Sequence, residues 1–154
     1  MTLSVSQAAK ALGTYSNWSI SNLKMQKMLY FAHMFFLGRT TKYLIDEEFE
    51  AWDYGPVLPS LYKQVKFFGA DNIIDIFQDD DSFPLTPEEL ALKPEYQILK
   101  EVADLLAHRP AGQLVSITHR QEGAWAKHYR SGAKGVRIPN SDILEEYKHL
   151  YGTQ

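Results

Sequence analysis

The chain of 154 residues contains no cysteine. It therefore has no disulfide, no thiolate metal ligand and no thiol nucleophile, a composition that suits a reducing compartment. No stretch approaches the roughly 18 uncharged apolar residues of a membrane-spanning helix. The first residues also lack the basic start and apolar centre of a signal peptide. These absences predict a soluble, cytoplasmic protein without a membrane partner.

Catalytic signatures are missing as well. The sequence has no HExxH pair, no G-x-S-x-G elbow, no phosphate-binding glycine loop and no dinucleotide fingerprint. Its histidines are scattered rather than set at metal-ligand spacing, and we interpret His33 as a satisfied core or boundary histidine. Glu50 and Asp53 are conceivable acid–base groups, but carboxylates on a strand edge more often face solvent. We expect no enzyme activity, no metal and no cofactor.

The length and composition are those of one ordinary globular domain. Hydrophobic residues make up 45% of the chain and charged residues 23%, and no repeat of fixed period is visible. A chain of this size buries about two thirds of the surface that its unfolded form exposes. We therefore predict a single domain over residues 1–154.

Charge is unevenly distributed along the chain although the net value is only −3. Residues 71–104 carry ten carboxylates against two lysines, whereas residues 119–137 carry five lysines and arginines against one glutamate. The segregation either steers a partner or simply balances itself within the fold. Within the acidic segment, Asp79 to Asp81 lack the spacing of a calcium loop and are interpreted as a solvated loop.

The stretch from Leu23 to Tyr62 organises the predicted fold. Its first part predicts a helix that is apolar on two sides, begins at Ser21 or Asn22 and ends at Gly38. One stripe comprises Met25, Met28, Leu29, Ala32, Phe35 and Phe36, and the opposite stripe comprises Leu23, Tyr30, Met34 and Leu37. A helix with two apolar stripes must be covered from both directions, so we place it at the centre.

The other segments predict shorter helices and one small β element. A first helix runs from the Ser4 cap through Leu12 and stops at Gly13. Alternation around Phe49 to Trp52 indicates a short strand or one half of a hairpin before the Gly55-Pro56 turn. Further helices are expected to start at Pro59, Pro87, Pro94, Ala111 and after Pro139. The predicted fold class is mainly α, a compact helical domain with a small strand or hairpin.

Two aromatic groups are candidate binding residues. If Phe49 faces the core, strand alternation turns Trp52 outward beside Tyr54 and Tyr62, an arrangement suited to an interface anchor. The competing interpretation packs Trp52 beneath the helix that begins at Pro59, because large aromatic residues are usually mostly buried.

The second group lies in the basic segment. Trp125 and Tyr129 are four residues apart, as on one helical face, and Lys127 lies between them. Such residues could bind RNA by stacking on bases and pairing with phosphates, or Trp125 could be a buried anchor of the loop. Because the whole protein is acidic, nucleic-acid binding is not the favoured interpretation.

Three spaced motifs resemble those of the Panacea domain family, which includes SocA-like and phage-associated GepA-like proteins. They are the Leu-Lys-x-Gln-Lys-x-Leu-Tyr run at residues 23–30, the Ala-Trp-x-Tyr-Gly-Pro-Val turn at residues 51–57, and Thr118-His119 followed by Trp125. The similarity extends from about Ser4 to Tyr147. The family often has proline before this tryptophan, where the present chain has Ala124, so the loop is expected to be less rigid here.

The resemblance implies an antitoxin that binds and neutralises a cognate protein toxin, encoded by an adjacent gene. One family member acts instead as an adaptor that delivers its toxin to a AAA+ protease, so that role is an alternative, as is RNA binding. The expected partner-binding residues are Trp52, Tyr54, Tyr62, Thr118, His119, Trp125 and Lys127. The expected structural motif residues are Leu23, Gln26, Lys27, Leu29, Tyr30, Gly55 and Pro56.

Overall fold

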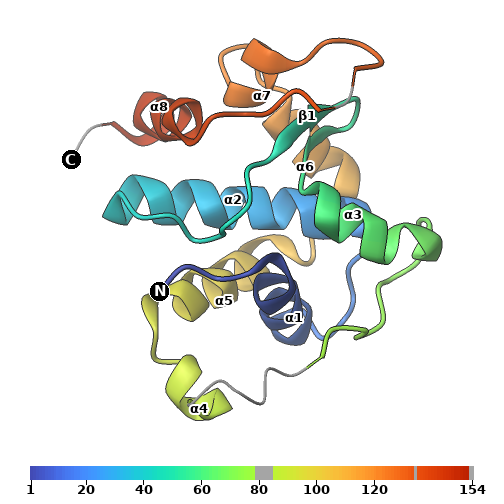
Figure 1. Cartoon of the computed structure of the whole chain (residues 1–154), viewed down its shortest axis with the longest axis vertical. Coiled ribbons are helices and arrows are strands. Elements are labelled where there is room, and N and C mark those ends of the chain that lie inside the picture. The colour runs from blue at the N-terminus through green and yellow to red at the C-terminus, as the bar shows by residue number, and fades with distance from the viewer. Residues whose placement is uncertain (79–84, 134, 153–154) are drawn as a thin grey trace.

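The computed structural model describes residues 1–78, 85–133 and 135–152, and it confirms the mainly α class. One long helix, α2, crosses the middle of the molecule, with α1 and α5 on one side and the β-hairpin, α6, α7 and α8 on the other (Figure 1). The elements are α1 Val5–Tyr15, α2 Asn22–Thr40, β1 Glu50–Trp52, β2 Gly55–Val57, α3 Pro59–Val65, the 3-10 helix η1 Lys66–Phe68, α4 Pro87–Leu90, α5 Pro94–Leu106, α6 Ala111–Thr118, α7 Ala124–His128 and α8 Asn140–Tyr151. The expected loop at Asp79 to Asp81 lies outside the described residues.

Helix α2 begins as predicted but continues past its predicted end. The Ser21 hydroxyl accepts a hydrogen bond from the Lys24 amide and caps the first turn. Gly38 does not terminate the helix, which continues to Thr40 and is capped by Thr41 in the left-handed conformation. A Cβ on Gly38 would lie 2.2 Å from ring carbons of Tyr147, so glycine is needed there because α8 packs closely against α2.

The predicted end of the first helix at Gly13 is also wrong, because this glycine too lies against an aromatic ring. Ser4 caps α1 in a capping box with Gln7, and the helix runs on to Tyr15. A Cβ on Gly13 would lie 2.2 Å from the Trp18 ring. Trp18 folds back over this helix after its C-terminus, so the glycine permits a close approach instead of a turn.

The two sides of α2 differ in chemistry. Helix geometry places Met25, Met28, Leu29, Ala32 and Phe36 toward α1 and α5, and all five are buried. Gln26, Lys27, Tyr30 and His33 lie on the opposite side, toward the hairpin and α8, and all four are also buried. The helix is therefore covered from both directions, as expected, but its second side is rich in polar groups.

A two-stranded antiparallel hairpin lies above α2, with Trp52 paired to Gly55 and Glu50 paired to Val57. Gly55 has φ of +118°, which only glycine adopts readily, so this turn requires a glycine. The segment before α8 adds to the outer edge of β1, because the Ala51 amide donates to Val136 and the Ile138 amide donates to Phe49. These bonds fix the orientation of the hairpin.

Candidate partner-binding surface

A cleft of about 470 Å³ opens beside the hairpin. Three of the predicted partner-binding residues, Trp52, Tyr54 and Tyr62, line it together. The other lining residues come from the start of α2, the turn of the hairpin, the end of β2, the turn after η1 and the loop before α8: Asn22, Leu23, Gln26, Asp53, Val57, Gly69, Ala70, Gly132 and Ala133. The walls are thus mainly apolar and aromatic.

The position of Trp52 follows the alternation of its strand. Phe49 and Ala51 are completely buried, whereas Trp52 is half-buried and directed into the cleft. Its indole Nε1 donates to Glu50 Oε1 at 2.9 Å, and its ring meets Tyr62 edge-on with centroids 4.9 Å apart. Tyr54, at the tip of the hairpin, is 70% exposed. Trp52 is therefore neither a free surface side chain nor a core residue.

A stack of three rings supports the hairpin from behind. The Trp125 ring lies between His119, at 3.8 Å, and Tyr129, at 4.5 Å, with nearly parallel planes. The Trp125 Nε1 donates to the Trp52 carbonyl at 2.7 Å, and the Tyr129 hydroxyl donates to Asp53 Oδ1. This bond to Asp53 raises the pKa of Tyr129. Two members of the stack, Trp125 and Tyr129, therefore hold Trp52 and Asp53 in place through hydrogen bonds.

This geometry changes the interpretation of the third motif. Trp125 is 8% exposed and Thr118 is 1% exposed, with its hydroxyl donating to the Val115 carbonyl. Neither side chain is accessible to a partner in this conformation, because the hairpin and the helices around them cover both. His119 is partly covered, and Lys127 is exposed on α7 but does not line the cleft. Only the hairpin and α3 residues of the predicted set share one surface.

Lys27 is completely buried beneath the hairpin. Its Nζ has no hydrogen-bond partner among the described residues, and a Cβ on Gly55 would lie only 2.6 Å from it. Burial lowers the pKa of Lys27 to about 7, since a charged amine is poorly solvated there. Burial, with a smaller contribution from Lys27, also lowers the pKa of His119, whose Nε2 is likewise unpartnered within the described chain.

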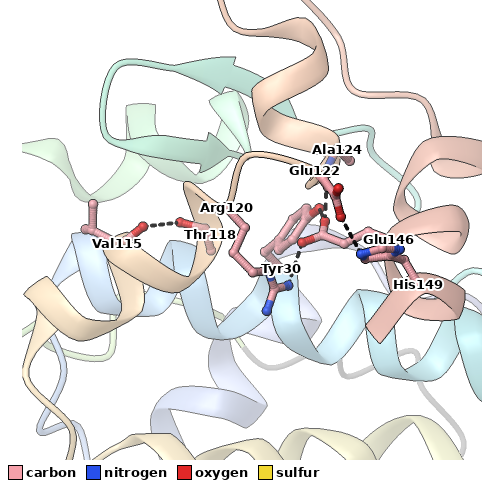
Figure 2. Close-up of polar contacts among 8 residues, drawn as sticks. All are labelled: Tyr30, Val115, Thr118, Arg120, Glu122, Ala124, Glu146 and His149. Carbon is pink, nitrogen blue, oxygen red and sulfur yellow. Dashed lines mark hydrogen bonds and ion pairs between the residues drawn. The ribbon is translucent and has the colours of Figure 1, made fainter. Parts of the chain in front are cut away.

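A buried carboxylate of α8 contacts α2, the loop after α6 and the start of α7. Glu146 of α8 accepts hydrogen bonds from the Tyr30 hydroxyl, the Arg120 guanidinium and the Ala124 amide (Figure 2). Burial and the adjacent carboxylate raise the pKa of Tyr30. Sequence reasoning missed Glu146, although its position within the apolar face of α8, between Ile143 and Tyr147, was an available signal.

His33 has the surroundings of a satisfied core histidine. It is completely buried, its Nε2 lies 2.8 Å from Asn140 Oδ1, and its Nδ1 accepts from the Ile45 amide. With Nδ1 as acceptor, Nε2 carries the proton and donates to Asn140. Burial lowers the pKa of His33, which agrees with a neutral ring.

Within the described residues, no group of three potential ligands is placed to hold a metal ion. In the same part of the chain, no helix is long and apolar enough to cross a membrane.

Comparison with known proteins identifies relatives of this chain. The family profile described as "Antitoxin SocA-like, Panacea domain" matches residues 25–126. The chain is 33% identical over 111 residues to the Antitoxin SocA of Caulobacter vibrioides (strain NA1000 / CB15N), an alignment that covers 69% of this chain and 58% of that relative. No solved structure matches it. The region that the profile matches includes most of α2, the hairpin and the stacked rings of His119 and Trp125, and the chain belongs to the SocA-like Panacea-domain family of antitoxins.

Proposed function

We propose that this protein is an antitoxin that neutralises a cognate protein toxin by forming a direct complex with it in the cytoplasm. The observation that carries the proposal is the aromatic cleft of a protein from an antitoxin family. Trp and Tyr dominate the energetics of protein interfaces because they bury large areas at a small entropy cost. Trp52, Tyr54 and Tyr62 provide three such side chains around one concave site.

The support beneath the cleft favours the same function. A binding surface gains affinity when its side chains are already held in place before the partner arrives. Here the hairpin is fixed by the Trp125–Trp52 hydrogen bond, the Tyr129–Asp53 hydrogen bond and the backbone bonds of residues 136–138. Gln26 adds a bond from the Leu58 amide at 2.8 Å. A rigid aromatic surface suits recognition of a folded protein.

The test is co-expression with the product of the adjacent gene. We expect that product alone to stop growth, this chain to restore growth, and the two proteins to co-purify as a complex. A neighbour that is harmless alone, or rescue without any co-purification, contradicts the proposal. Rescue that also needs a cellular AAA+ protease would instead indicate the adaptor role.

A binding experiment with RNA separates the antitoxin role from RNA binding. The Trp125 ring has both faces occupied, by His119 and Tyr129, so it is not available to stack on a base. We therefore expect the purified protein to show no retention of single-stranded RNA at physiological salt. Retention that disappears in a Lys127→Ala, Arg130→Ala variant would favour the RNA alternative.

A further inference from the structure

Two side-chain amides near the start of α2 line the aromatic cleft. Asn22 and Gln26 are four residues apart, so they lie one turn apart on the same face of the helix. Gln26 is buried and Asn22 is partly exposed. A side-chain amide has an acceptor oxygen and a donor nitrogen, so the direction in which each amide points decides what the cleft offers to a partner.

The backbone of Leu58 fixes the direction of the Gln26 amide. The Leu58 N–H donates to Gln26 Oε1 at 2.8 Å, a position that only the oxygen of the amide can occupy. Gln26 Nε2 therefore faces the other way, 3.3 Å from Asn22 Oδ1 and 3.5 Å from the Leu58 carbonyl oxygen. Both N–H groups of Gln26 thus have acceptors, as a buried amide requires.

Gln26 in turn fixes the direction of the Asn22 amide. Because Gln26 Nε2 can only donate, the Asn22 atom that faces it must be the oxygen. Asn22 Nδ2 then points away from Gln26, and it has no acceptor within the described part of the chain. Asn22 therefore offers a donor that is unused and already oriented before a partner arrives.

We propose that Asn22 is a specificity-determining contact of this antitoxin, and that its Nδ2 donates to a backbone carbonyl of the toxin segment that enters the cleft. Gln26 is a positioning residue in this scheme, because it acts through Asn22. A donor that is held in place discriminates strongly, since a partner without an acceptor at this point leaves the donor desolvated and unpaired. The inference rests on the proposed function and adds the kind of group that the toxin must present.

A carboxylate of the toxin is the competing acceptor. The cleft walls beside Asn22 include Leu23, Val57 and Ala70, and a charged group loses hydration against such apolar walls. Asn22 would give a carboxylate a neutral donor in return, without a counter-charge. A backbone carbonyl is neutral and is satisfied by a single donor. It is therefore the acceptor that suits this site better.

Asn22→Asp tests the donor and keeps its support. Aspartate retains an oxygen for Gln26 Nε2, and a carboxylate in the first turn of α2 favours the helix, so thermal stability should not fall. The variant replaces the donor with an acceptor that faces the toxin carbonyl. We expect toxin affinity to fall at least about tenfold, by an amount that hardly changes as the salt concentration is raised.

Asn72→Asp is the matched control. Asn72 forms an isolated β-bridge with Ser21 beside the start of α2, is exposed and does not line the cleft. The same charge change at this position should alter toxin affinity less than about twofold. An equal loss of affinity in both variants would attribute the effect to charge alone and would overturn the inference.

Nuclear magnetic resonance follows the donor directly. In the ¹⁵N-labelled full chain titrated with unlabelled toxin, we expect the Asn22 side-chain amide protons to shift downfield and to exchange more slowly with solvent. An unchanged Asn22 signal in the complex, or normal affinity of Asn22→Asp, overturns the inference and leaves the antitoxin proposal intact. A loss of affinity that shrinks as salt is raised indicates a carboxylate and overturns the assignment to a backbone carbonyl. Absence of any complex with the wild-type chain contradicts the antitoxin proposal and this inference together.

Discussion

The two sides of helix α2 are both buried, but different interactions hold each of them. The side toward α1 and α5 is apolar and is joined to α5 at its ends by Lys24, which donates to the Ala107 carbonyl, and by the Arg39–Glu101 ion pair. The side toward the hairpin and α8 buries Tyr30 and His33 with directed hydrogen bonds. Apolar packing tolerates small shifts, whereas directed bonds require a defined position. The side that positions the proposed binding surface is the one built from directed bonds.

The largest expected effect comes from removing the carboxylate of the polar side. Glu146→Ala leaves Tyr30 buried without its acceptor and the partly buried Arg120 without its counter-charge, so we expect the free energy of unfolding to fall by about 3 kcal/mol. Leu29→Ala on the apolar side should cost a similar 2–5 kcal/mol. Urea unfolding measures both losses.

Affinity distinguishes these two variants. Under conditions where both remain folded, Glu146→Ala should also weaken toxin binding, because Glu146 holds the Ala124 amide at the start of the helix that carries Trp125. Leu29→Ala should leave the affinity within about twofold. Equal losses of affinity would show that the two sides of α2 contribute alike to the binding surface.

The next effect concerns the turn above Lys27. Gly55→Ala should lower the free energy of unfolding by about 2 kcal/mol, since alanine is strained at φ of +118° and its methyl group would meet the lysine. Gly112→Ala is the matched control, because it lies in α6 with open space around it and should be neutral or stabilising by up to about 1 kcal/mol. Thermal unfolding followed by circular dichroism compares the two. A neutral Gly55→Ala would contradict the close approach.

Trp52→Ala tests the surface itself. Because the side chain is half-buried against Tyr62, we expect a stability loss of about 1–2 kcal/mol, less than for a core tryptophan. Its loss of toxin affinity should be larger, about 2 kcal/mol or more, as for an interface hot spot. Lys127→Ala, outside the cleft, should change stability by less than about 0.5 kcal/mol. A stability loss above about 3 kcal/mol for Trp52→Ala, with affinity unchanged, would remove this residue from the interface.

The last expected effect is a dependence of stability on pH. The pKa of Lys27 is about 7 in the folded chain and near its ordinary value in the unfolded chain, so the unfolded state binds the extra proton between these values. Stability therefore rises with pH above about 7, by at most about 1.4 kcal/mol per pH unit. Lys27→Met removes this dependence. We expect the variant to be more stable than the wild-type chain at pH 6, with the difference shrinking by pH 9. Parallel curves from urea unfolding at four pH values would contradict a buried, unpaired Lys27.

Sequence reasoning located most elements because their signals are local. Proline at the first position of α3, α4 and α5, the Ser4 and Ser21 caps and the alternation at β1 are set by neighbouring residues. The two errors in helix ends have a common cause. Gly13 and Gly38 are occupied by glycine because an aromatic ring approaches from elsewhere in the fold, and no local pattern reports such an approach.

The candidate site was predictable only in part. Trp52 and Tyr54 could be assigned to an outward face from strand alternation alone. The roles of Lys27, Thr118 and Trp125 depend on which residues cover them, and the hairpin that covers them is distant in sequence. A family motif marks such residues as important, but it does not distinguish residues exposed at the cleft from buried residues that support the hairpin.

The Tyr30–Glu146 bond has a consequence for the order of folding, because its two residues are separated by 116 positions. Joining distant segments costs more chain entropy than joining near ones, so contacts of high sequence separation tend to form late. Helices α1 and α2, by contrast, are neighbours in sequence and pack together on the apolar side. We expect the apolar side to form the folding nucleus and α8 to dock afterwards. In stopped-flow measurements, Glu146→Ala should therefore accelerate unfolding and leave the folding rate nearly unchanged, whereas Leu29→Ala should slow folding.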